Sequence, residues 1–339
     1  SNWDPDFPTT ARQAEWFIGK ELNRQPAGTL ALNFFVVQKL LQVLGEVQLP
    51  GTSQPLTAAN LFDRAQTSPQ LSLAPGAPPV QTDIFSSTLE TLYRRLTQLD
   101  SPRWFSLATA ITQLLDQKQL LISPVDSHLA LLLQHQGWDG SLAPRQFILP
   151  PRVDLKSHYS DFINLSEANL GVNKSNFFIT RNIHHQLRFF KEDNLIATTI
   201  VTYYNASPSN TWPVGTYKNY LRFYLPLGST LEQLLLNDQI IPLRQVDFSI
   251  DHNQTVFGFL VSVPPQEQRR LTLTYKLPGQ LNFINNRAFY SLVVPKQSGT
   301  STDPLTVSLT LPPYYRVVST TPPREPVPGT VTFLTDLAT

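Results

Sequence analysis

The chain has 339 residues, of which 41% are hydrophobic and 15% are charged, and its net charge is +1. This length suits two domains better than a single core. The even charge, without a basic run, excludes a nucleic-acid-binding protein. The absence of cysteine excludes disulfides, thiol catalysis, zinc fingers and iron–sulfur clusters.

Residues 1–149 are predicted to form a mixed α/β domain that is mostly helical. In the first helix, Ala14, Phe17, Ile18 and Leu22 form one apolar stripe. Short strands are predicted at residues 28–33 and 46–50. Apolar residues recur with a helical period in residues 9–22, 34–45, 56–66, 83–99, 100–119 and 123–137.

After Pro150-Pro151 the pattern changes from helix to strand. Residues 152–339 are predicted to be an all-β antiparallel sandwich region, built as one large or two small sandwiches. Only residues 229–238, STLEQLLLND, have a helical pattern. Strands rich in Val, Ile, Thr, Tyr and Phe are predicted at residues 177–190, 194–205, 219–227, 255–264, 269–278, 287–297, 305–312 and 329–335.

Residues 166–181, SEANLGVNKSNFFITR, contain a glycine, a lysine and a serine at spacings that raise the question of a phosphate-binding loop. A P-loop requires glycine directly before the lysine and a helix after the serine. Here Asn173 precedes Lys174, and a strand pattern follows Ser175. We therefore predict a turn that leads into the first strand of the sandwich.

The histidines do not form a metal-binding motif. They are His128, His135, His158, His184, His185 and His252. His184 and His185 are adjacent in a predicted strand, so they point to opposite faces and cannot share one metal. The metalloprotease pattern His-Glu-x-x-His is absent. No metal site and no cofactor are predicted.

Two acidic residues near the N-terminus are candidate ligands. Asp4 and Asp6 alternate around Pro5 and can face together, which would serve a cation or a sugar. Alternatively, Asp6 and the prolines set up the following helix, whose positive end favours an acidic residue.

Aromatic residues are concentrated in the predicted sandwich, often as adjacent pairs that place one ring inside and one outside. The outward rings are expected either to pair across strands or to stack on sugars or a partner. The residues are Phe177, Phe178, Phe189, Phe190, Tyr203, Tyr204, Tyr220, Phe223, Tyr224, Phe289 and Tyr290.

Several strings resemble, in order, the bacterial family of domains of unknown function numbered 4012. They begin with NWDPDFPTTARQAEWF and continue through KQLLISPVDSHLALLLQHQGWDG, and their most specific parts are EANLGVNKSNFFI and VVPKQSGT. The resemblance implies an extracytoplasmic envelope protein that is anchored in the membrane by a helix upstream of this fragment. It implies no activity, and the first domain can be incomplete at its N-terminus.

A narrower likeness covers residues 30–66, which are similar to the middle of LytR-CpsA-Psr proteins. That family transfers lipid-pyrophosphate-linked glycopolymers to peptidoglycan and has a Gly-Gly-Val turn and a helix that ends in arginines. Here the turn is Gly45-Glu46-Val47, Gln66 stands near the expected first arginine, and Arg64 comes two positions early. A shared fold follows more readily than shared catalysis.

Together these observations favour a non-catalytic, membrane-anchored envelope protein with a structural or binding role. Its partner would be a cell-wall polymer or another envelope protein. One alternative is a glycopolymer transferase-like or degenerate enzyme, with Asp4, Asp6 and Arg64 as its site residues and Mg²⁺ as its metal. A further alternative is a carbohydrate-binding module, which predicts a row of exposed rings on one face of the sandwich.

Overall fold

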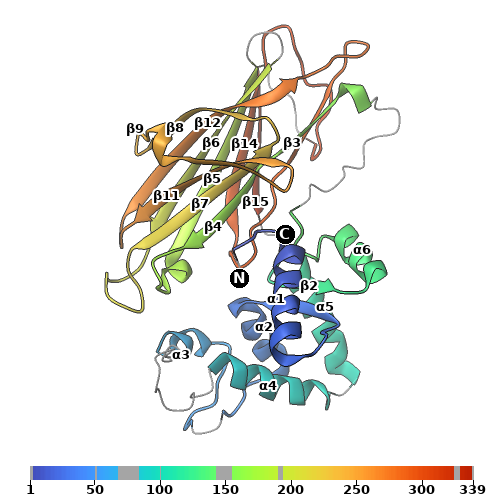
Figure 1. Ribbon diagram of the computed structural model, residues 1–339, viewed down its shortest axis with the longest axis vertical. Coiled ribbons are helices and arrows are strands. Elements are labelled where there is room, and N and C mark those ends of the chain that lie inside the picture. Colours follow the sequence, from blue (N-terminus) through green and yellow to red (C-terminus); the bar gives the residue numbers. More distant parts are fainter. Residues whose placement is uncertain are drawn as a thin grey trace. The chain divides into compact units, whose positions relative to one another are not determined.

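The computed structural model describes residues 3–49, 52–67, 84–99, 101–142, 155–189, 194–323 and 329–337. These residues form two compact units, which are drawn in Figure 1. The first unit is Ser1–Ser141 with Ser298–Thr300 and Thr339, and the second is Leu142–Gln297 with Ser301–Ala338. The change of pattern predicted at Pro150-Pro151 lies outside the described residues.

The first unit contains helices that begin at short polar side chains. Asp6 caps α1 by accepting a hydrogen bond from the Thr9 amide at 3.0 Å, and Asn33 and Asp126 cap α2 and α6 in the same way. The elements are α1 Phe7–Leu22, β1 Gly28–Leu32, α2 Phe34–Leu44, α3 Leu61–Thr67, α4 Ile84–Leu96, α5 Ser101–Asp116, β2 Leu120–Pro124 and α6 Ser127–Gln136.

Helix α2 lies at the centre of this unit and buries two faces. Val37 and Leu41 pack with Leu61 and Leu92 from α3 and α4, whereas Val36 packs on a cluster from α5 and β2. The antiparallel ribbon of β1 and β2 contacts α1, and β2 also contacts α5 and α6. The core of the unit is therefore assembled around α2 and this ribbon.

Three predictions made from the sequence of the first unit are wrong. Of the strand predicted at residues 46–50, the described residues 46–49 do not form one; Val47 makes an isolated bridge with Leu56. Strand β2 was not predicted. The predicted apolar stripe of α1 is not buried, because Phe17, Ile18 and Leu22 are exposed and the helix packs instead through Phe7 and Ala11 nearer its start.

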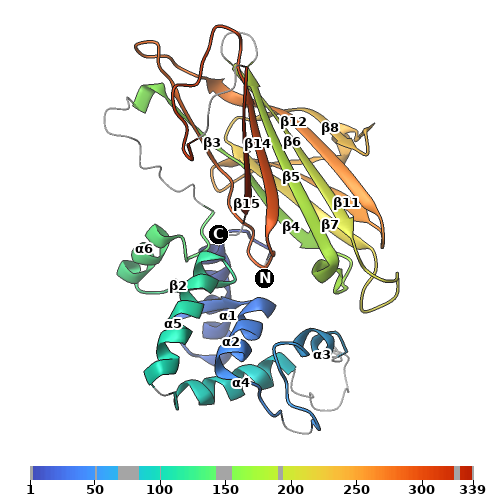
Figure 2. The same cartoon turned by 180° about the vertical axis from the view of Figure 1, so that it is seen from behind.

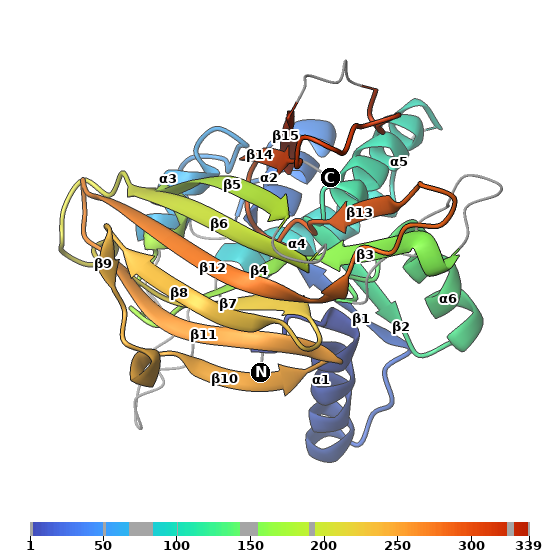
Figure 3. The same cartoon turned by 90° about the horizontal axis from the view of Figure 1, so that it is seen from above.

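The second unit is built from two facing sheets, seen from behind in Figure 2 and from above in Figure 3. One has four strands in the order β10-β11-β7-β4, and the other has seven in the order β15-β14-β5-β6-β12-β8-β9. Strands β3 and β13 form a separate two-stranded sheet. The strands are β3 His158–Phe162, β4 Asn164–Asn169, β5 Ile179–Phe189, β6 Asn194–Asn205, β7 Tyr217–Pro226, β8 Thr230–Leu236, β9 Gln239–Ile240, β10 Asp247–Asp251, β11 Gln254–Val263, β12 Gln268–Gln280, β13 Phe289–Val293, β14 Asp303–Thr310 and β15 Thr330–Leu337.

One apolar core fills the space between these two sheets. Phe223 and Phe259 from the four-stranded sheet stack with ring centroids 6.0 Å apart, and Tyr203 and Leu273 from the other sheet are completely buried with them. The side chains of each strand alternate between this core and the outer face, as a half-buried strand requires.

The fold class predicted from the sequence is wrong. Over the described residues the chain is 40% strand and 27% helix, with six helices in a mostly β arrangement. The prediction of a mostly helical first domain also gave too little weight to the β1–β2 ribbon, on which α1, α5 and α6 pack. The sandwich region is not purely antiparallel either, because β5 pairs in parallel with β14 and β3 pairs in parallel with β13.

The predicted helical pattern at residues 229–238 is strand β8, and a bulge explains the error. Leu231 pairs with Tyr275 and Gln233 pairs with Thr274, so Glu232 is an extra residue in the ladder. The bulge lets Leu231 and Leu234 pack on the same core although they are three residues apart. A spacing of three is also the spacing of an apolar stripe on a helix.

Candidate functional site

A buried carboxylate, Glu167 on β4, collects three hydrogen bonds inside the sandwich. It accepts from the Arg181 guanidinium at 2.7 Å, from the Tyr203 hydroxyl at 2.6 Å and from the Tyr217 hydroxyl at 3.0 Å. Arg181 also bonds Asp303 at 2.7 Å. The charged side chains are at most 8% exposed. We call these five residues the Glu167 cluster.

The electrostatics of the Glu167 cluster hold Arg181 in its charged form. Burial alone would lower the pKa of Arg181, but the negative charges of Glu167 and Asp303 outweigh it and raise that pKa. Burial and the adjacent carboxylate raise the pKa of Tyr203 and Tyr217, so both hydroxyls keep their protons as donors. Both terminal nitrogens of Arg181 and the hydroxyls of Tyr203 and Tyr217 donate to the carboxylates of the cluster, which is the arrangement of a structural ion network.

A second buried polar group lies between β3 and β5. Asp161 accepts hydrogen bonds from the Tyr290 hydroxyl at 2.6 Å and from the Phe162 amide at 2.7 Å. His185 Nε2 is 4.0 Å from an Asp161 oxygen, and its Nδ1 is 3.0 Å from the Thr199 hydroxyl. Both Asp161 and His185 are completely buried.

Burial shifts the pKa values of Asp161 and His185 in opposite directions. It raises the pKa of Asp161 to about 7, partly offset by the hydrogen bonds from Tyr290 and Phe162. It lowers the pKa of His185 to about 4, with a smaller contribution from His184. Near pH 6 the folded protein therefore holds a protonated Asp161 beside a neutral His185, which avoids two buried charges.

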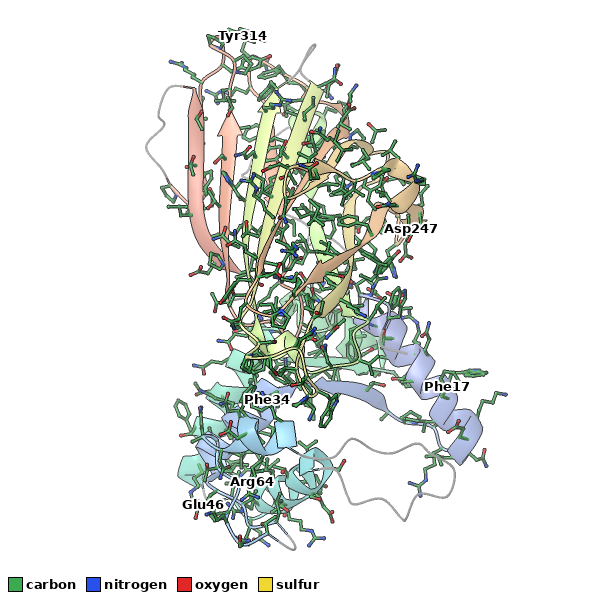
Figure 4. All side chains as sticks on the ribbon, turned by 90° about the vertical axis from the view of Figure 1, so that its left-hand side faces the viewer. Phe17, Phe34, Glu46, Arg64, Asp247 and Tyr314 are labelled. Carbon is green, nitrogen blue, oxygen red and sulfur yellow. The ribbon has the colours of Figure 1, made fainter. Side chains whose placement is uncertain are left out.

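Unlike these two buried groups, one face of α1 exposes large side chains to solvent. Trp16 and Phe17 are 58% and 50% exposed, and their rings meet edge to face at 5.0 Å. They line an open groove of about 590 Å³ with Thr9, Arg12 and Gln13. Figure 4 shows Phe17 extending outward from α1. This surface offers ring faces beside a guanidinium and an amide, so it can bind a ligand that has both apolar faces and hydrogen-bonding groups.

The three site residues named from the sequence do not form one site. Asp6 is the N-cap of α1, and Asp4 accepts a hydrogen bond from the Asp6 amide at 2.9 Å. Arg64 lies on α3, and the start of α1 is well separated from α3 in both Figure 1 and Figure 2. Over the described residues no group of three or more acidic or histidine side chains is placed to hold a metal ion.

The loop after β4 is structural, with its polar side chains directed at the neighbouring loop. Asn173 donates to the Thr216 carbonyl at 3.0 Å, and Ser175 donates to the Gly215 carbonyl at 2.8 Å. A short 3₁₀ turn, Ser175–Phe178, then leads into β5. The groups that a phosphate would need are used to join two segments of the sandwich.

Adjacent aromatic residues do not always place one ring inside and one outside. Tyr203 is buried and Tyr204 is 38% exposed, as the alternation predicts. Phe223 and Tyr224 are both buried, because Phe162 and Val256 cover Tyr224 on the outer face of the four-stranded sheet. Phe190 lies outside the described residues. The two parallel strands β3 and β13, which bring Phe162 to this face, were not predicted to pair.

Sequence reasoning also missed the charged residues of the sandwich core. Arg181 and His185 alternate with Ile183 and Leu187 on β5, and all four are buried. The pattern could have identified Arg181 as an inward-facing charge that requires a buried acidic partner. It could not identify Glu167 and Asp303 as that partner, because they lie 14 and 122 residues away.

Glu167→Gln should destabilise the protein strongly. A glutamine has one acceptor oxygen in place of two, and its amide group would face the donors of Arg181, Tyr203 and Tyr217. We expect a loss of about 3–5 kcal/mol in the free energy of unfolding, measured by urea denaturation with circular dichroism. Glu232→Gln, the same change at an exposed position on β8, is the control and should stay within about 0.5 kcal/mol. A small loss for Glu167→Gln would show that the cluster is not required for stability.

Asp161 and His185 should give opposite pH dependences of stability. The folded pKa of Asp161, about 7, lies above its ordinary 3.8, so its contribution is lost as the pH rises from about 4 to 7. The folded pKa of His185, about 4, lies below its ordinary 6.5, so its contribution is lost as the pH falls over nearly the same range. In the wild type the two nearly cancel.

Single substitutions should separate these two contributions. Asp161→Asn removes the titration of Asp161, so stability relative to the wild type should rise between about pH 4 and 7. His185→Gln removes the titration of His185, so stability relative to the wild type should fall between about pH 4 and 6.5. Each change should amount to about 2–3 kcal/mol in urea titrations at several pH values. Parallel pH profiles for the two variants would contradict the assignment.

The first part of the chain matches a known protein family. Residues 1–68 match the family described as "Protein of unknown function (DUF4012)", which supports the resemblance drawn from the sequence over those residues. No curated protein matches the chain significantly. No described helix is both long enough and apolar enough to cross a membrane.

Solved structures give only weak likenesses. A protein from Legionella pneumophila described as nutrient binding is 10% identical, with a TM-score of 0.27 over 43% of this chain and 54% of that one. An M1 zinc metallopeptidase from Deinococcus radiodurans is 16% identical, with a TM-score of 0.23 over 47% of this chain and 38% of that one. Native leukotriene A4 hydrolase from Saccharomyces cerevisiae is 10% identical, with a TM-score of 0.26 over 56% of this chain and 32% of that one. The chain thus spans about half or less of these proteins, and such low scores carry no argument about fold or function.

Proposed function

We propose that this chain is a non-catalytic protein of the bacterial cell envelope that binds a cell-wall polymer through α1. The observation that carries the proposal is the groove of Trp16 and Phe17, in which two large rings are about half exposed beside Arg12 and Gln13. An extracytoplasmic location and a membrane anchor are part of the proposal, and they rest on the resemblance to the family of unknown function.

The buried ionisable groups support a role without catalysis. Arg181, Glu167 and Asp303 are sealed in the sandwich and bond one another, and a catalytic group must instead reach a substrate. Asp161 and His185 are also fully buried, so their shifted pKa values are explained by the core around them. These shifts therefore do not mark an active site.

The α1 groove has the features that a sugar polymer requires. The two rings meet edge to face, so they present ring faces at different angles to one ligand. The ammonium group of Lys20 lies 5.9 Å from the centre of the Trp16 ring, which adds a positive charge beside the exposed rings. Arg12 and Gln13 supply hydrogen-bond donors for hydroxyl, carboxylate or phosphate groups of the polymer.

The transferase-like alternative receives no comparable support, because Asp4 and Asp6 begin α1 whereas Arg64 lies on α3. Sugar binding by rings on the sandwich also receives less support, since Tyr203 and Phe223 are buried in the core.

The proposal is tested by sedimenting the whole chain with purified bacterial cell walls, with and without their attached glycopolymers. We expect saturable binding to walls that carry the glycopolymer, and Trp16→Ala should weaken it about tenfold or more by removing the larger ring. The control is Trp104→Ala on α5, which removes a tryptophan that is 51% exposed and lies outside the groove.

The alternatives have distinct results in this assay. Equal binding by Trp16→Ala and Trp104→Ala, or no binding at all, would overturn the proposed role of α1. Transfer of glycopolymer from a lipid-pyrophosphate-linked donor to peptidoglycan by the wild-type chain in the presence of magnesium, lost in a variant of Arg64, would establish the transferase alternative in its place.

A further inference from the structure

Strand β10 forms an open edge of the four-stranded sheet. Its five residues, Asp247–Asp251, pair with β11 on one side, and β10 is the last strand of that sheet in the described part of the chain. Figure 3 shows β10 beyond β11 at the border of the sandwich. An edge strand presents backbone N–H and C=O groups that another strand can pair with.

The side of β10 that faces the core carries apolar residues, and these extend the core beyond β11. Phe248 pairs with Phe257, a core residue, and the two ring centroids are 5.9 Å apart. Phe248 and Ile250 share this side of the strand, yet each is 64% exposed. Two large apolar side chains thus stand at the sheet edge, where an added strand would cover them.

The outward side of β10 is acidic at both ends. Asp247 accepts a hydrogen bond from the Tyr220 hydroxyl at 2.7 Å, and Asp251 accepts one from the Tyr224 hydroxyl at 3.2 Å. Each carboxylate retains lone pairs for another donor. Figure 4 shows Asp247 on the outside of the sandwich. Asp247 and Asp251 are four steps apart along the strand, which separates them by roughly 13 Å.

We propose that β10 binds an extended segment of a partner protein, which joins the sheet as an additional strand. The charge pattern defines the segment: basic residues at its first and fifth positions, opposite Asp247 and Asp251, and apolar residues at its second and fourth, opposite Phe248 and Ile250. Opposite charges and apolar pairs in register stabilise neighbouring strands, and main-chain bonding to an exposed edge is a known mode of peptide recognition.

A second copy of the chain fits this edge poorly. A symmetric antiparallel pair centred on Ser249 would place Asp247 of one copy opposite Asp251 of the other, twice. Like charges directly opposite each other destabilise a strand pair. The same carboxylates that disfavour self-association therefore select a basic segment.

The test measures binding of fluorescein-labelled peptides to the whole chain by fluorescence anisotropy. One peptide has the central sequence Lys-Val-Thr-Val-Lys and the other has Glu-Val-Thr-Val-Glu. The wild type should bind the basic peptide about tenfold or more tightly than the acidic one. In D247K/D251K the preference should reverse, because the charges opposite the peptide are exchanged.

Two further variants separate edge binding from general charge effects. E232K/D336K changes the net charge by the same amount at exposed positions on β8 and β15, and it should keep the preference for the basic peptide. F248S/I250S should weaken binding about fivefold or more with the charges unchanged. Far-ultraviolet circular dichroism and the melting temperature establish that each variant is folded.

The proposal is overturned if neither peptide binds, if D247K/D251K keeps the wild-type preference, or if E232K/D336K reverses it. It is also overturned if sedimentation velocity shows a dimer that F248S/I250S dissociates, since the edge would then be occupied by a second copy. This inference is independent of the polymer-binding proposal, and Trp16→Ala on α1 should leave peptide binding unchanged.

Discussion

Glu167 is the side chain on which the arrangement of the sandwich depends. It belongs to the four-stranded sheet, as does its partner Tyr217, whereas Arg181 and Tyr203 belong to the seven-stranded sheet. Its hydrogen bonds therefore join the two sheets. A buried carboxylate without these donors would be very costly, so the sheets are held in the one alignment that satisfies it. Arg181 extends the same network to Asp303 at the start of β14.

The buried charged groups bond one another, so the candidate binding sites of this chain lie on its surface. Arg181, Glu167 and Asp303 are paired with one another in the sandwich interior, and the apolar side chains of the core fill the space between the sheets. By contrast, Trp16 and Phe17 on α1 and Phe248 and Ile250 on β10 are large apolar side chains that remain exposed. Exposed apolar clusters next to charged side chains are typical of interaction surfaces. The two surfaces lie in different units of the chain, so each can be altered without changing the other.

Local sequence patterns predict elements well where one signal dominates. The alternation in residues 179–189 identifies β5, and Asp6 begins α1 as a residue of its type should. Prediction fails where the local signal is shared by two structures. The leucines of β8 have a helical spacing because Glu232 is bulged, and the five residues of β2 are too few for a clear period beside the long helix before them. The parallel pairing of β5 with β14 depends on residues more than a hundred positions apart, which no local pattern contains.

Neither candidate binding surface could be predicted from the sequence alone. Phe17 belongs to the predicted apolar stripe and is easily taken for a core residue, because a helical stripe does not say how much of the helix is covered. The packing of α1 through Phe7 and Ala11 leaves Phe17 and its neighbour Trp16 exposed. In the same way, Asp-Phe-Ser-Ile-Asp is an ordinary alternating strand until the sheet order places it at an edge. Exposure is a property of what lies beside an element, and for both surfaces the tertiary fold turns a pattern typical of burial into one suited to binding.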